Sequence, residues 1–206
     1  MSDSKTQGQP EGAATEVDMS LLTPTRAKRA TNAAAEALAG LTRRPLRGGN
    51  VNFWKGVPRA MPVTTSQRVA VRVVITTEYR ELSGLLVAER RLATLVVNCM
   101  IGEERDSQMD AFEDLHRSVL SEALGGVASA VQEALSSQYG SVQISISPGV
   151  VEAGEVILDV PECVFAGVEL VDGSESAGWL GVVTGAAGRH CRRGVRGRGT
   201  RQQIAQ

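Results

Sequence analysis

Few residues of this chain combine the type and spacing that catalysis requires. The two histidines are His116, two residues after Asp114 in a predicted helix, and His190, in an arginine-rich segment. Residues two apart on a helix do not face each other, so His116 and Asp114 do not form a catalytic dyad. No Cys or His pair has metal-ligand spacing, and no glycine-rich phosphate or dinucleotide motif occurs. The sequence therefore predicts no enzyme activity, no cofactor and no metal site.

Charge is unevenly distributed along the chain, although the formal net charge is only −1. Residues 26–59 are basic, residues 76–175 hold eighteen acids against five bases, and no acid follows Glu175. The last segment instead contains six arginines: Arg189, Arg192, Arg193, Arg196, Arg198 and Arg201. Such asymmetry indicates either flanks that bind a polyanion or flanks that dock on an acidic copy of the same domain.

The cysteines and the hydropathy pattern indicate the compartment. Cys99, Cys163 and Cys191 are widely spaced and offer no even disulfide framework, which favours reduced thiols in a cytoplasmic setting. The N-terminus lacks the basic and apolar regions of a signal peptide. No apolar run reaches membrane-spanning length, so no membrane association is expected.

Two flanking segments are predicted before the regular domain begins. Residues 1–22 have no hydrophobic periodicity and are expected to be disordered. Residues 23–66 are expected to form a basic arm, in which Thr23 and Pro24 begin a helix that ends near Gly40. The rest of this arm, RRPLRGGNVNFWKGVPRAMP, is rich in glycine and proline and is predicted to be a loop.

An α+β domain is predicted over residues 67–175, followed by a Gly/Arg-rich tail over 176–206. Alternation in RVAVRVVITTEY predicts a strand, which a polar connection, RELSGLLVAER, is expected to follow. RLATLVVNCMI, apolar on both faces, is predicted to be the central strand. SQMDAFEDLHRSVLSEAL predicts a helix starting at Ser107, which Gly125 and Gly126 kink or break. The segments SVQISIS, GEVILDV and ECVFAGVELV predict further strands. We therefore expect a largely antiparallel sheet of four to five strands with a long broken helix on one face.

The order of these segments resembles a family of phage proteins. The series VVITTEYRELSG, AERRLATLVVNCMI and DSQMDAFEDLHRSVLSEAL, with LGG at residues 124–126, is similar to tail-terminator and related minor tail proteins of long-tailed bacteriophages. The similarity covers roughly residues 68–172. It implies a structural protein without an active site, which forms a ring, commonly a hexamer, at the head-proximal end of the tail.

The resemblance also implies partners and a location. The partners would be further copies of the chain in the ring, together with the tail tube or the connector. The protein would be assembled in the host cytoplasm and reside in the virion. In this hypothesis Arg43, Arg44 and Arg47 lie on the acidic face of a neighbouring subunit, with Phe53 and Trp54 as anchors. The alternative for both aromatic residues is that they cover one end of the domain's own core.

Nucleic-acid binding is the competing hypothesis. RRGVRGRG resembles an RG-rich segment, in which Arg189, Arg192, Arg193, Arg196, Arg198 and Arg201 would contact phosphates and bases. Such binding would weaken steeply with salt. The acidity of the preceding domain opposes it, because like charges repel over about a Debye length.

Overall fold

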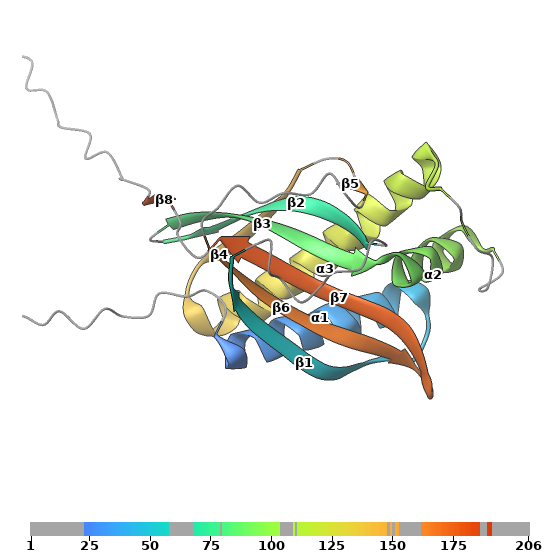
Figure 1. Cartoon of the computed structure of the whole chain (residues 1–206), viewed down its shortest axis with the longest axis horizontal. Helices are drawn as coiled ribbons and strands as arrows, with labels where there is room; N and C mark the ends of the chain where they lie inside the picture. Colours follow the sequence, from blue (N-terminus) through green and yellow to red (C-terminus); the bar gives the residue numbers. More distant parts are fainter. Residues whose placement is uncertain are drawn as a thin grey trace, which may run out of the picture.

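The computed structural model describes residues 23–57, 68–78, 80–103, 109, 111–147, 149, 151–152, 162–185 and 189–190. These residues form three helices and a twisted sheet (Figure 1). The helices are α1 (Pro24–Thr42), α2 (Arg90–Ile101) and α3 (Asp114–Tyr139). The strands are β1 (Leu46–Gly56), β2 (Arg68–Thr77), β3 (Arg80–Glu89), β4 (Val142–Ile146), β5 (Val151–Glu152), β6 (Cys163–Asp172), β7 (Glu175–Gly185) and β8 (Arg189–His190).

The sheet is antiparallel throughout its main path, which runs β1-β6-β7-β3-β2-β4. The short strands β5 and β8 pair with β2 and β3 beside this path. The predicted α+β class with a largely antiparallel sheet is therefore confirmed. The six main strands exceed the four to five expected, because β1 and β3 were predicted to be connections and most of β7 was assigned to the tail.

The chain contains two copies of one structural unit, which consists of a helix, a strand and a hairpin. The first unit is α1, β1 and the β2–β3 hairpin, and the second is α3, β4 and the β6–β7 hairpin. β1 pairs with β6 of the second unit, β4 pairs with β2 of the first, and β3 and β7 meet in the middle. The two units are thus related by an approximate two-fold axis, and each contributes an edge strand to the hairpin of the other.

The main core lies between the sheet and the helices. Figure 1 shows α1 and α3 lying side by side behind the sheet, where they contact each other extensively. Their inward residues occupy equivalent positions, with Leu38 of α1 and Leu135 of α3 both 1% exposed. Thr23 begins α1 by accepting a hydrogen bond from the Arg26 amide at 3.4 Å, beside Pro24 at the first helical turn.

A second apolar cluster lies on the other face of the sheet. Phe165 is its centre, and its ring lies over Gly167 and Gly181, which are paired across β6 and β7. Trp179 meets the Phe165 ring edge-on at a centroid separation of 6.2 Å, and Trp54 packs on the same cluster. The two glycines leave room for the ring, since a Cβ on either would approach it within 2.6 Å.

The predicted central strand RLATLVVNCMI is wrong, because residues 90–101 form helix α2. Leu92, Ala93, Val96 and Val97 are buried together, which a helix achieves at its 3.6-residue period. The helix ends at Gly102, whose φ of 79° is a left-handed conformation that suits glycine. A run that is apolar on every face does not separate a buried strand from a buried helix.

Two connections predicted from composition are also wrong. The glycine-rich segment after α1 forms strand β1, which pairs with β6 from Leu46 to Gly56 with a shift between Gly48 and Val51. Such a shift lets glycines be included in an edge strand. The polar connection RELSGLLVAER supplies strand β3, which lies in the middle of the sheet.

Helix α3 differs from its prediction at its start and in its middle. It runs unbroken through Gly125 and Gly126, with Leu41 of α1 packing where a Gly126 side chain would begin. It begins at Asp114, where the Glu113 amide donates to His116 Nδ1 at 3.2 Å. Ser107 lies outside the described residues, as does the predicted strand GEVILDV.

The predicted domain boundaries stay predictions. Within the predicted arm of residues 23–66, α1 and β1 share the sheet and core of the elements in 67–175. Strand β7 continues this sheet to Gly185. Residues 1–22 and 191–206 lie outside the described residues.

Candidate functional site

A groove runs between α1 and α3 on the side of the helices that faces away from the sheet. The two helices are antiparallel, so that Leu41 near the end of α1 meets Gly126 in the first half of α3. The groove has a volume of about 560 Å³. Its lining residues come from both helices: Arg29, Asn32, Ala33, Glu36, Ala37, Ala130, Glu133, Ala134 and Ser137.

The lining is shaped by the internal two-fold relation. Ala33 and Ala37 of α1 and Ala130 and Ala134 of α3 are small, half-buried side chains, and they keep the groove open. Glu36 and Glu133 occupy equivalent positions of the two helices, each within a Glu-Ala-Leu tripeptide whose leucine is buried. The leucine anchors each helix to the core, and the helical period then directs the glutamate toward solvent.

The charged side chains of the groove are two glutamates and one arginine, and all three are exposed to solvent. Glu36, Glu133 and Arg29 are exposed, and no ion pair within the described part of the chain engages any of them. Two exposed carboxylates above an alanine floor suit a partner that presents arginine or lysine, because charged hydrogen bonds to carboxylate are strong and directional. The described residues contain no group of three or more His, Cys, Asp and Glu that could hold a metal ion.

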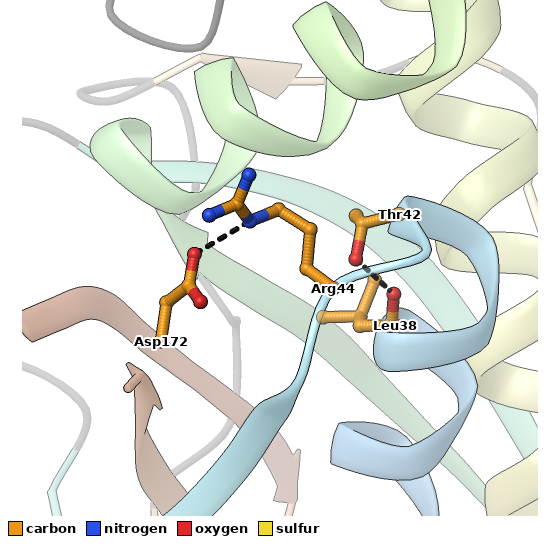
Figure 2. A network of polar contacts seen from close by, with 4 residues as sticks. All are labelled: Leu38, Thr42, Arg44 and Asp172. Carbon is orange, nitrogen blue, oxygen red and sulfur yellow. Dashed lines mark hydrogen bonds and ion pairs between the residues drawn. The ribbon is translucent and has the colours of Figure 1, made fainter. Parts of the chain in front are cut away.

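An internal ion pair fixes the turn that follows α1. Arg44 Nε donates to Asp172 Oδ2 of β6 at 2.6 Å, and Thr42 Oγ1 donates to the Leu38 carbonyl at 2.7 Å (Figure 2). The Asp172 side chain is 5% exposed and that of Arg44 31%. This contact joins the end of the first groove helix to the sheet across the two repeated units.

Replacing Arg44 by alanine is expected to lower the free energy of unfolding by about 1–2 kcal/mol, less than for a fully buried pair because Arg44 is partly solvated. Lys55→Ala is the matched control. Lys55 pairs with Glu162 at 3.6 Å with both side chains largely in solvent, so its loss should cost less than about 0.5 kcal/mol. Urea denaturation measures both, and equal costs for the two variants would contradict the structural role of Arg44.

The five interface residues proposed from the sequence do not form one cluster in the structure. Arg43 and Arg47 are exposed, whereas Arg44 is in the ion pair with Asp172. Phe53 is 38% exposed, and Trp54 is half-buried against the second apolar cluster. None of the five lines the groove between α1 and α3. Their role as an interface stays a prediction.

The arginine tail is described only at its first residues. Arg189 and His190 form strand β8, which pairs with Arg80 and Glu81 of β3. Arg192, Arg193, Arg196, Arg198 and Arg201 lie outside the described residues. Their proposed contact with nucleic acid stays a prediction.

The described cysteines do not suggest a nucleophile. Neither Cys99 nor Cys163 forms a disulfide within the described part of the chain. Burial raises the pKa of the Cys163 thiol, and the nearby Glu162 carboxylate raises it further. A thiol with a raised pKa is largely protonated at neutral pH, and the thiolate is the reactive form.

No helix among the described residues has the length and hydropathy needed to span a membrane. The chain matches no protein-family model and no curated protein. Similarity to solved structures, in contrast, extends over most of the chain.

The similar structures are flagellar and chemotaxis proteins. FliY of Thermotoga maritima is 20% identical with a TM-score of 0.59, covering 78% of this chain and 90% of that one. The FliG–FliM complex of H. pylori gives 12% identity and a TM-score of 0.63, covering 81% and 96%. The chemotaxis protein CheX of Vibrio vulnificus gives 11% and 0.54, covering 78% and 97%. At these low identities, the TM-scores show a shared fold.

The predicted membership of the phage tail-terminator or head-tail joining proteins is therefore wrong. The expected ring in a virion, with the tail tube or connector as partners, is corrected with it, since the similar folds belong to flagellar and chemotaxis proteins. The error has a physical reason in one segment. The resemblance was based on AERRLATLVVNCMI as the entry into an apolar strand, whereas residues 90–101 of this segment form helix α2.

The groove residues were missed by the sequence interpretation. Glu-Ala-Leu occurs at residues 36–38, 122–124 and 133–135, so the tripeptide alone does not distinguish Glu36 and Glu133 from Glu122. What Glu36 and Glu133 share is their place in the helix, because each lies six residues before the last residue of α1 or α3. These helix ends were needed to recognise the two positions as equivalent.

Proposed function

We propose that this protein is a binding module of the bacterial flagellar switch or chemotaxis machinery, and that it holds its protein partner in the groove between α1 and α3. The observation that carries this proposal is the pair of exposed carboxylates, Glu36 and Glu133, on either side of the alanine floor. The similarity to FliY, FliM and CheX supports the choice of machinery. The partner would present basic side chains to the groove.

A titration of the purified chain with FliG from the same bacterium tests the proposal. FliG is chosen because one similar structure is that of a FliG–FliM complex. We expect saturable one-to-one binding with a Kd on the order of micromolar, which corresponds to about −8 kcal/mol. Absence of binding at a hundredfold higher concentration would contradict the choice of FliG.

We further propose that the protein acts by binding and not by catalysis. The alternative is phosphatase activity in the groove. Asn32 and Glu36, four residues apart on α1, are the polar pair in the groove to which such chemistry would be assigned. Binding is favoured because the groove is open and its polar side chains are exposed to solvent, whereas closed active sites commonly expel water.

Incubation with acetyl phosphate is expected to release no more phosphate than the Asn32→Ala/Glu36→Gln variant releases. Acetyl phosphate is an acyl phosphate small enough to enter the groove. Phosphate is measured colorimetrically over time at several protein concentrations. Release that scales with the wild-type protein and is lost in the variant would establish catalysis and contradict the binding-only proposal.

A further inference from the structure

The C-terminal segment leaves the sheet close to one end of the groove. Strand β8 pairs Arg189 and His190 with Glu81 and Arg80, beside the turn that joins β2 to β3. On the other side of this hairpin, Thr77 pairs with Val142 of β4. Ser136 Oγ in turn donates to the Val142 carbonyl at 2.9 Å, so the last turn of α3 lies beside the start of β4. The next residue of α3, Ser137, lines the groove.

Acidic side chains mark the route from β8 to the groove. Glu81 is exposed at the pairing with Arg189, and exposed Glu78 lies at the end of α3, 3.5 Å from where a Gly140 side chain would begin. Glu133 and Glu36 follow within the groove. Arg29 is the one base among the groove-lining residues.

The segment beyond β8 has the complementary charge and sufficient length. Residues 191–206 contain five arginines, Arg192, Arg193, Arg196, Arg198 and Arg201, and no acid. Sixteen residues in extended form span about 50 Å. The groove is lined by residues 29–37 and 130–137, which correspond to about 12 Å of helix. The tail can therefore pass the end of α3 and lie along the whole groove.

We propose that residues 191–206 dock in the α1/α3 groove of their own chain, with arginine side chains on Glu36 and Glu133. The tail then occupies the surface to which the partner binds, so the partner must displace it. This competition rests on the proposed function, whereas the docking itself does not. Charge attraction between a tethered segment and its site is effective even when each contact is weak, because the tether keeps the local concentration high.

Limited trypsin digestion of the full-length chain tests the docking. Trypsin cleaves after arginine, so a docked tail is protected and a released tail is not. The Glu36→Gln/Glu133→Gln variant is expected to be cleaved after Arg192, Arg193 and Arg196 about fivefold faster than the wild type, the effect of two solvent-exposed charge pairs. Salt at about 0.5 M should accelerate cleavage of the wild type toward the same rate. Mass spectrometry of the released peptides gives the rates.

Glu122→Gln is the matched control, since Glu122 is an exposed glutamate of α3 outside the groove and should leave the rates unchanged. A free peptide of residues 189–206 corrects for effects of salt on trypsin.

Equal cleavage of wild type and the double variant would overturn the proposal. Protection that grows with protein concentration would overturn it in favour of docking on a second copy. Protection that appears only with an added oligonucleotide would overturn it in favour of nucleic acid. The digestion contains no FliG, so its outcome tests tail docking independently of whether FliG binds.

Discussion

Replacement of both Glu36 and Glu133 by arginine is expected to weaken partner binding at least about 100-fold. The loss of a charge pair within an interface costs about 2–5 kcal/mol, and each 1.4 kcal/mol is a factor of ten in Kd. Reversal of the charge adds repulsion of the partner's basic side chains to this loss. Because both glutamates are exposed and lie in no ion pair of the described residues, the fold should be preserved.

Calorimetric titration with FliG measures this effect, and Glu122→Arg is the control. Glu122 is exposed on α3 like Glu133 but does not line the groove. Its reversal should change the affinity by less than about threefold, in keeping with a charge at the rim or outside an interface. A loss of binding as large as that of the double variant would show a general charge effect and would contradict specific recognition in the groove.

The second large effect is expected on stability, from Phe165→Ala. The Phe165 ring is 3% exposed and fills the space above Gly167 and Gly181, which have no side chains of their own. Its removal also deprives Trp179 of its edge-on contact. We expect a loss of about 3–5 kcal/mol in the free energy of unfolding, as for other buried phenylalanines.

Phe53→Ala is the matched control for this variant, because Phe53 lies on neighbouring strand β1 and is 38% exposed. Its replacement should cost less than about 1 kcal/mol, since only part of the ring is removed from water on folding. Urea unfolding followed by tryptophan fluorescence measures both variants. Costs that are equal would contradict the description of Phe165 as the centre of the second apolar cluster.

The parts of the fold that the sequence predicted are those in which one periodicity is unambiguous. In 142–146 the apolar residues lie on one side only, and in 69–75 the branched residues Val69, Val71, Val73 and Ile75 share one side, and both segments are strands. The helix from Pro24 was predicted from a cap and a small-residue stripe, and both features are present. In these segments local and tertiary preferences agree, so the pattern is sufficient.

The failures occur where tertiary contacts decide between two local options. Residues 92–101 would present apolar side chains on both faces of a strand, and residues 90–101 form a helix that packs on α3 and β7. Strand β1 contains Gly48, Gly49 and Gly56, which favour a loop locally, but pairing with β6 supplies its hydrogen bonds. Gly125 and Gly126 stay helical because α3 packs along α1, whose Leu41 covers Gly126.

The candidate site could not be predicted from local pattern, because it exists only where two distant helices meet. Glu36 and Glu133 are ordinary exposed glutamates within their own helices. They line one groove because the two repeated units place α1 and α3 antiparallel on the same face of the sheet. The tripeptide Glu-Ala-Leu occurs three times in the chain and does not mark these two positions, and their juxtaposition depends on the topology of the whole sheet.

Site-directed photo-cross-linking in the complex with FliG tests most directly that the α1/α3 groove is the docking surface. Benzoylphenylalanine is placed at Asn32 or Ser137, two exposed groove positions, and at Asn52 or Gln143, exposed positions on edge strands β1 and β4. We predict a cross-linked product of chain plus FliG from Asn32 and Ser137, and none from the two strands. Cross-links from Asn52 or Gln143 with none from the groove positions would contradict the proposed site.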